Sequence, residues 1–202
     1  MDAAILSGFR SVAPLGLNGG DMGEAGRNSV RRASGCSEKI ARCAEMQLPS
    51  GDAIIIATQT SLEEIGIAID AAKAAGALTI IASLAYDLSQ DKTFYVTMMG
   101  VMPDRAATFA EERGANIIAL NCGTGMDMNG AAMVARNYRE SCNLPVMVQP
   151  NAGLPVLENL KAVYKQLPAD MALGVPGALE AGANIIGSCC GSTPDHTRAI
   201  RE

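Results

Sequence analysis

Short apolar runs alternate with helical stretches along most of this chain, and this alternation restricts the possible fold more than any other feature. The runs are mainly apolar, and they cover residues 53–58, 78–84, 116–121, 145–149 and 184–188. Continuously apolar strands are typical of a parallel sheet that is buried on both faces. The sequence therefore predicts an α/β fold with a parallel sheet.

The segments between these runs carry the signals of helices. Ser61 followed by Glu64 forms a capping box, which predicts a helix that ends near Gly76. Residues 10–15 add one more predicted strand. Both a closed barrel and an open doubly wound sheet fit this order of elements. The remaining predicted helices cover 104–113, 127–141, 168–181 and the residues from Pro194 onward.

The composition argues against several classes of protein. The 202 residues suffice for one domain, and with 3% aromatic residues its core must consist of aliphatic side chains and Met. A net charge of −5 without a basic block argues against nucleic acid or an anionic membrane as partner. We recognise no transmembrane run and no signal peptide, which predicts a cytoplasmic protein. The six cysteines are then expected as thiols or metal ligands, because reducing compartments disfavour disulfides.

Polar and thiol side chains directly follow the predicted strands. The carboxyl ends of parallel strands meet at one edge of the sheet, where the active sites of barrels and doubly wound folds lie. No Gly-rich phosphate loop follows the first clear strand, which argues against a dinucleotide site. The candidate site residues at this edge are Thr58, Asn121, Cys122, Asn151, Cys189 and Cys190.

The sequence favours Cys122, Cys189 and Cys190 as metal ligands. Adjacent cysteines seldom form a disulfide with each other without strain, whereas both can bind one soft metal ion. Three protein ligands with an open fourth position are typical of catalytic zinc. The alternative is that these thiols only pack in the core, as free cysteines often do. Cys142 is predicted to be a core residue, and the single histidine, His196, a helix cap or surface residue.

Three motifs resemble those of the homocysteine S-methyltransferase family. They are Asn-Cys-Gly at 121–123, Gln-Pro-Asn-Ala-Gly-Leu-Pro at 149–155 and Gly-Ser-Cys-Cys-Gly-Ser-Thr-Pro-Asp-His at 187–196. Their order and approximate spacing also match, and the resemblance covers residues 53–202. It implies a TIM (β/α)8-type barrel, with residues 1–202 as a single homocysteine-binding-type domain in which residues 1–50 are poorly defined.

The resemblance also implies a metal and a reaction. The family binds Zn²⁺ through three cysteines, which match Cys122, Cys189 and Cys190 here. The implied activity is zinc-dependent transfer of a methyl group to a small thiol, with homocysteine as the expected acceptor and methionine as the product.

Asn151, Asn121 and Thr58 are the expected substrate-binding residues. Asn151 is expected to contact the amino or carboxylate group of the substrate, and Asn121 either orients Cys122 or binds substrate. The family typically has Glu-Thr where this chain has Ala57 and Thr58. That Glu helps to bind the homocysteine amino group. Its replacement by Ala57 therefore leaves open whether the acceptor is an amino acid.

The start of the chain also departs from the family. Family members open with an Asp-Gly-Ala/Gly-Met-Gly-Thr turn on the first strand, which is missing here. Only about six of the eight barrel strands are readable, so we expect a barrel that is incomplete at its N-terminus. Open sheet edges favour pairing with another chain, so we expect a homo-oligomer.

The sequence leaves the methyl donor open. A methylated corrinoid such as methylcobalamin on a docking protein, a betaine-type onium compound and S-methylmethionine all fit. Two other classes remain as alternatives: a non-catalytic zinc-binding barrel remnant, and an unrelated barrel enzyme, such as an aldolase, with buried cysteines. A Schiff-base aldolase requires a Lys at a strand end, and none follows the clear strands.

Overall fold

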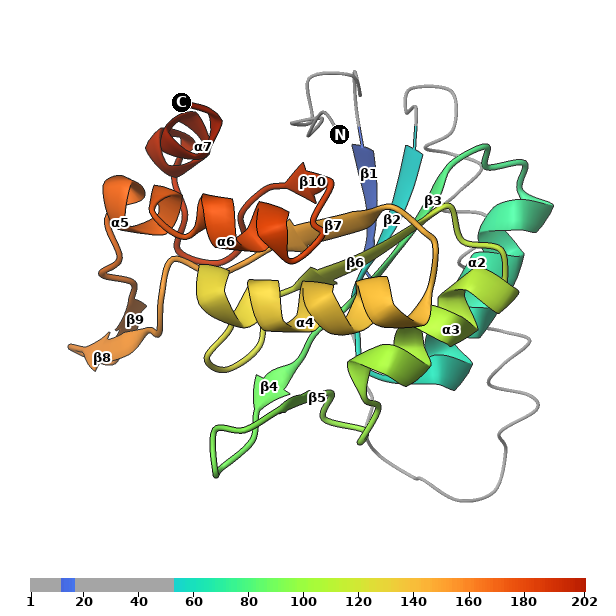
Figure 1. The fold of residues 1–202 in the computed structure, drawn as a ribbon, viewed down its shortest axis with the longest axis horizontal. Coiled ribbons are helices and arrows are strands. Elements are labelled where there is room, and N and C mark those ends of the chain that lie inside the picture. The colour runs from blue at the N-terminus through green and yellow to red at the C-terminus, as the bar shows by residue number, and fades with distance from the viewer. Residues whose placement is uncertain (1–11, 17–52) are drawn as a thin grey trace.

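The computed structural model describes residues 12–16 and 53–202, in which six parallel strands form one sheet (Figure 1). The strand order β1-β2-β3-β6-β7-β10 follows the chain without reversal, unlike the order of a doubly wound sheet. The predicted parallel α/β fold is confirmed, while β1 and β10 are unjoined edges of the described sheet. The strands are β1 (Val12–Gly16), β2 (Ala53–Gln59), β3 (Ile80–Leu84), β6 (Ile117–Asn121), β7 (Val146–Gln149) and β10 (Ile185–Ile186). Expectations for residues 1–11 and 17–52 lie outside the described residues.

The helices lie along one side of the sheet, where α2 packs on β2 and β3 and α4 on β6 and β7 (Figure 1). The Ser61 side chain accepts a hydrogen bond from the Glu64 amide, which confirms the predicted start of α2. No helix in the described part of the chain is long and apolar enough to cross a membrane. The helices are α2 (Leu62–Ala74), α3 (Pro103–Glu112), α4 (Met128–Ser141), α5 (Pro168–Ala172), α6 (Val175–Glu180) and α7 (Pro194–Arg201).

The structure corrects two predicted elements. The single helix expected over 168–181 is divided into α5 and α6, because Pro176 has no amide hydrogen to continue the helical bonding. The strand expected over 184–188 has two residues in β10, although the amide of Gly187 still bonds to the carbonyl of Val148. The chain therefore leaves the sheet earlier than predicted and enters the cysteine-bearing turn.

Two short hairpins, which the sequence did not predict, extend the loops at the carboxyl ends of β3 and β7. The first pairs β4 (Asp87–Leu88) with β5 (Tyr95–Val96). The second pairs β8 (Val156–Glu158) with β9 (Lys161–Val163). Both hairpins are visible below and to the left of the sheet in Figure 1.

Successive strand residues divide between two apolar clusters, because side chains alternate across a strand. On β2, Ile54 and Ile56 pack with the helices, whereas Ala53 and Ile55 belong to a smaller cluster made only of strand residues. The smaller cluster lies on the sheet face opposite the helices, as the inner face of a barrel sheet would. Its members are Ala53, Ile55, Ile81, Ile117, Ala119, Met147 and Ile185.

Candidate metal centre

Three thiols converge at the carboxyl ends of β6 and β10. Cys122 directly follows β6, and Cys189 and Cys190 follow β10 in the next turn. The Sγ atoms of Cys122 and Cys190 are 3.3 Å apart, and those of Cys189 and Cys190 are 3.9 Å apart. All three sulfur atoms lie within 4.8 Å of one another. The structure thus brings together the three predicted ligands from two distant segments.

The backbone turns sharply at Cys122. Its φ of 61° lies in the left-handed region, which is uncommon for residues other than glycine. Gly123 follows with a φ of 99°, and a Cβ there would lie 1.8 Å from the carbonyl oxygen of Tyr86. Thr58, at the end of β2, also has a positive φ of 59°. Strained residues of this kind concentrate at functional sites, and here two of them lie at the same edge of the sheet.

Asn121 connects β2, β3 and the thiols. Its Oδ1 accepts from the Thr58 amide (3.0 Å) and the Ser83 hydroxyl (2.7 Å). Its Nδ2 donates to Thr58 Oγ1 (2.8 Å) and to the Cys189 sulfur (3.8 Å). These four bonds use the whole hydrogen-bonding capacity of an amide side chain. The geometry therefore favours an orienting role for Asn121, acting on Cys189 and not on Cys122.

The turn after β7 supports the dithiol segment through the main chain. The amide of Cys189 donates to the carbonyl of Pro150 (2.8 Å), and the amide of Ala152 donates to the carbonyl of Cys190 (2.9 Å). The Pro-Asn-Ala-Gly turn and the two adjacent cysteines are therefore one hydrogen-bonded unit.

Asn151 lies in this turn, and its side-chain amide is only partly hydrogen-bonded by the described residues. Its Nδ2 donates to the carbonyl of Gly123 (3.0 Å), and its own amide donates to the carbonyl of Met126 (2.8 Å). The Gly123 contact orients the side chain, because only the amino group can donate to a carbonyl. Its Oδ1 is buried and has no partner among the described residues. A buried acceptor of this kind can receive a donor from a ligand.

The pKa values of the thiols diverge because the sulfur atoms share hydrogen bonds. The hydrogen bond from Cys122 lowers the pKa of Cys189 to about 5, and the bond from Asn121 contributes to this shift. Conversely, the bond to Cys189 and then burial raise the pKa of Cys122 above its ordinary value. At neutral pH, Cys189 is therefore the thiolate of this pair and Cys122 its hydrogen-bond donor.

The thiol cluster fits a zinc ion. Tetrahedral zinc with Zn–S distances of about 2.3 Å places its sulfur ligands about 3.8 Å apart. The observed separations of 3.3 and 3.9 Å bracket this value. The depressed pKa of Cys189 also supplies one ligand in the ionised form that metals require.

Cys142 and His196 were the two other residues for which the sequence predicted an environment. Cys142 is buried in the helix-side core, as predicted. His196 caps the start of α7 by accepting from the Thr193 amide through Nδ1 (3.0 Å), which confirms the cap. It is 5% exposed, so of the two predicted alternatives, a cap or a surface residue, the cap is the one observed.

Sequence reasoning missed three residues near the thiols. Ser83 bonds to Asn121, and Tyr86 provides the carbonyl that requires Gly123. The sequence did contain a signal for Ser83, because this polar residue interrupts an otherwise apolar predicted strand. Tyr164 follows the unpredicted second hairpin, and nothing in the local sequence pointed to its place beside the dithiol segment.

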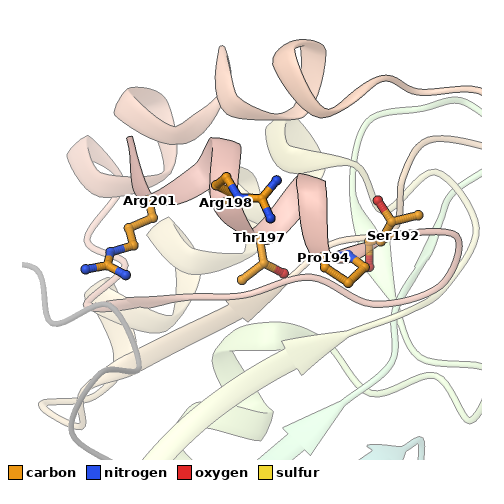
Figure 2. Close-up of a pocket in the computed structure, with 6 residues that line it drawn as sticks. Ser192, Pro194, Thr197, Arg198 and Arg201 are labelled. Carbon is orange, nitrogen blue, oxygen red and sulfur yellow. The ribbon is translucent and has the colours of Figure 1, made fainter.

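A separate hollow of about 570 Å³ lies beside α7 (Figure 2). The Arg198 side chain in its wall is paired with Asp195 at 2.5 Å. The three thiols are not part of its lining, so it is distinct from the metal centre. Its lining residues are Ser192, Thr193, Pro194, Thr197, Arg198 and Arg201.

The homocysteine S-methyltransferase family model matches residues 37–202. The chain belongs to this family. Within this homocysteine S-methyltransferase domain, the matched region contains all six predicted site residues. The family description agrees with the resemblance drawn from the three sequence motifs.

Curated relatives of this homocysteine S-methyltransferase domain include two methionine synthases. That of Mycobacterium tuberculosis is 38% identical over 104 residues, which are 51% of this chain and 9% of that protein. That of Mycobacterium leprae is 36% identical over 104 residues, or 51% of this chain and 8% of that protein. The chain therefore matches less than a tenth of the length of these relatives.

The fold of the domain is similar to that of the homocysteine methyltransferase MmuM from Escherichia coli. The apo form of MmuM superposes with a TM-score of 0.68 at 16% sequence identity. The match covers 94% of this chain and 61% of MmuM. At this identity the likeness supports the fold alone.

Proposed function

We propose that this domain is a zinc-dependent S-methyltransferase that transfers a methyl group to homocysteine and yields methionine. The observation that carries the proposal is the convergence of Cys122, Cys189 and Cys190 at the carboxyl edge of the sheet, in a chain of this family. The continuous strand order and the strand-only inner cluster support the finer view that the sheet belongs to a (β/α)8 barrel.

Cys122, Cys189 and Cys190 would hold the zinc and leave its fourth position for the substrate thiol. Bound zinc lowers the pKa of a coordinated thiol, so that it is a thiolate at neutral pH. Asn121 would keep the Cys189 sulfur in place through its hydrogen bond. In the overall reaction, a bond forms between the acceptor sulfur and the methyl carbon while the bond from that carbon to the donor breaks.

Asn151 is our candidate for binding the amino group of the acceptor. Its buried Oδ1, which has no partner in the described part of the chain, can accept a hydrogen bond from an ammonium group. Thr58 is exposed at the same edge and offers a hydroxyl for a second substrate contact. Ala57 provides no carboxylate, so we expect the ammonium to rely on neutral acceptors and homocysteine to bind more weakly than with a Glu at this position.

The donor and the partners belong to the proposal as well. A methylated corrinoid such as methylcobalamin, presented by a docking protein, is supported by the methionine synthase relatives. An onium compound or S-methylmethionine would require no docking protein. Within the described residues β1 and β10 are edges of the sheet, and such edges favour pairing with a second chain, which makes a homo-oligomer the proposed assembly.

The test combines zinc content with methyl transfer. We expect about one zinc per chain in chelator-washed protein and loss of most of it in Cys190→Ser, because two thiols bind zinc more weakly than three. Cys142→Ala is the matched control, since this thiol is buried in the helix-side core and should not affect zinc content. Absence of zinc from the parent protein, or full retention in Cys190→Ser, would contradict the assignment.

One alternative function is favoured by Ala57, which lacks the carboxylate typical of the family. In that alternative the domain binds zinc without catalysing methyl transfer. Methylation of homocysteine assayed with each of the three donor classes separates the two. Zinc binding without methyl transfer from any donor would favour the non-catalytic domain.

A further inference from the structure

Strand β2 carries an extra residue near its carboxyl end. Ile56 pairs with Ala82 of β3, but the next pair joins Gln59 to Leu84, so three steps along β2 match two along β3. This is the pattern of a β-bulge, and Thr58 lies inside it with a φ of 59°. Bulges beside active sites re-aim a side chain, and the side chain re-aimed here is that of Thr58.

The side chain of Gln59 is buried under this bulge. The residue is 2% exposed, although its side chain is a polar amide. Burying an amide costs free energy unless it is hydrogen-bonded, and Gln59 Nε2 donates to the carbonyl of Ala57 at 3.0 Å. Ala57 is the residue directly before Thr58, so the amide of Gln59 bridges the two sides of the bulge.

Thr58 is therefore fixed from several directions. A positive φ is a genuine outlier for a β-branched residue, and it persists only where the surrounding structure determines it. The Gln59 side chain holds the chain before Thr58, and the amide of Ala85 holds the chain after it by donating to the Gln59 carbonyl (2.9 Å). Asn121 bonds to both the amide and the hydroxyl of Thr58. The position of the exposed Thr58 hydroxyl depends on these bonds.

We propose that Gln59 is a positioning residue of the acceptor site, whose buried amide holds the bulge that keeps the Thr58 hydroxyl at the carboxyl edge of the sheet. The inference rests on the proposed function, in which Thr58 contacts the acceptor. At 2% exposure Gln59 is covered by the chain, so it acts through Thr58 and not by touching the acceptor. The net contribution of one neutral hydrogen bond corresponds to a change of about 2- to 12-fold in an equilibrium constant.

The first test is the kinetics of methyl transfer to homocysteine in Gln59→Leu, which removes the donor and keeps a buried side chain of similar length. KM for homocysteine should rise about 2- to 12-fold, whereas kcat should change less than KM, because the three thiols are untouched. Thr58→Val removes the hydroxyl and keeps the branched shape. If Gln59 acts through Thr58, the double variant has the KM of Thr58→Val alone, because coupled residues are not additive.

Amide hydrogen exchange tests the bulge without relying on methyl transfer. The Thr58 amide donates to Asn121 Oδ1 at 3.0 Å, and in Gln59→Leu it should exchange up to about tenfold faster. The Ile80 amide is the internal reference, because it also donates to a side-chain amide oxygen, Asn116 Oδ1, at 2.8 Å. Its exchange rate should stay that of the parent.

Thr97→Val is the matched control variant. Thr97 is also 2% exposed, and its hydroxyl donates to the carbonyl of Thr60 at 2.7 Å. Its loss removes a comparable buried bond at the same end of β2 and leaves the bond from Gln59 to Ala57 in place. The homocysteine KM and the exchange of the Thr58 amide should therefore stay close to those of the parent.

The outcomes separate this inference from the proposed function. A raised KM with faster Thr58 exchange in Gln59→Leu, and neither in Thr97→Val, supports the role of Gln59. Unchanged Thr58 exchange, equal acceleration at Ile80, or an additive rise of KM in the double variant overturns it. A parent protein without methyl transfer to homocysteine contradicts the proposed function, and the exchange rates alone then decide whether Gln59 holds Thr58.

Discussion

The two loops that carry the thiols are held in place by different means. The Cys122 loop follows a five-residue strand inside the sheet, and its shape depends on positive φ angles and on contact with the Tyr86 main chain. The dithiol loop follows the two-residue strand β10 at an edge of the described sheet. It is held by bonds to Pro150 and Ala152 and by the side chain of Tyr164.

The two halves of the site should therefore tolerate substitutions differently. A loop packed against main chain cannot relax, because neighbouring backbone is fixed by its own strand or turn. A loop packed against the β8–β9 hairpin can relax if that hairpin shifts, because the residues of β8 are all exposed. We therefore expect the Cys122 loop to be the rigid half of the centre and the dithiol loop the adaptable half.

The largest expected effect comes from adding a methyl group to the rigid half. Gly123→Ala combines a positive φ with a contact of 1.8 Å to the Tyr86 carbonyl, and should cost about 3 kcal/mol or more in unfolding free energy. Gly191→Ala meets Tyr164 Cγ at 2.1 Å and Cβ at 2.4 Å, and should cost less because the exposed hairpin that carries Tyr164 can shift. Denaturant unfolding of both variants measures the difference.

Gly100→Ala is the control for this pair. Gly100 has a φ of 79°, but a Cβ there meets nothing within 4 Å. It should show only the cost of the left-handed conformation, about 1 kcal/mol. The comparison breaks down if Gly191→Ala destabilises the protein as much as Gly123→Ala.

The next effect concerns the link between the two halves, Asn121. Asn121→Ala leaves the Thr58 amide and the Ser83 hydroxyl without their acceptor, and should cost about 2 kcal/mol. It also removes a donor to Cys189, so the pKa of that thiol should rise towards its ordinary value. Unfolding free energy and the pH dependence of thiol alkylation are the two measurements.

Asn116→Ala is the matched control for Asn121→Ala. Asn116 precedes β6, and its Oδ1 accepts from the Ile80 amide at 2.8 Å, far along the strand from the thiols. It should destabilise the protein without changing thiol alkylation. If Asn116→Ala changes alkylation as much as Asn121→Ala, general loosening of the sheet explains the effect and the specific link is wrong.

The smallest expected effect is the pH dependence of the metal-free thiols. Because the pKa of Cys189 is lowered from 9.0 to about 5, its thiolate should persist from pH 8 to pH 6. Its alkylation rate should change little over this range, whereas an ordinary thiol slows by nearly 100-fold. Peptide mapping of iodoacetamide-labelled protein assigns the label, and a rate at Cys189 that falls like that of the unfolded chain would refute the shift.

The lowered pKa of Cys189 also makes the stability of the folded protein depend on pH. A thiol with a lowered folded-state pKa stabilises the folded protein where it is ionised. The contribution is therefore fully present above pH 9 and is lost as the pH falls towards about 5. Asn121→Ala should reduce this dependence, because it removes one of the hydrogen bonds that stabilise the thiolate.

Local sequence patterns were sufficient to predict the parallel α/β fold, most strand positions and the three converging thiols. These follow from local patterns: apolar runs define buried strands, Ser61 and Glu64 define a helix start, and strand ends bring Cys122 and Cys189 to one edge. Parallel strands make this inference possible, because their carboxyl ends always lie together.

The organisation of that edge depends on contacts between distant segments, which local sequence patterns do not specify. The bond from Asn121 to Cys189 joins residues 68 positions apart, and its existence depends on the register of β6 against its neighbours. The place of Tyr164 depends on a hairpin whose pairing has no strong local signal, and on a contact with Gly191 made through space. Such contacts follow from packing and register, which no short stretch of sequence specifies.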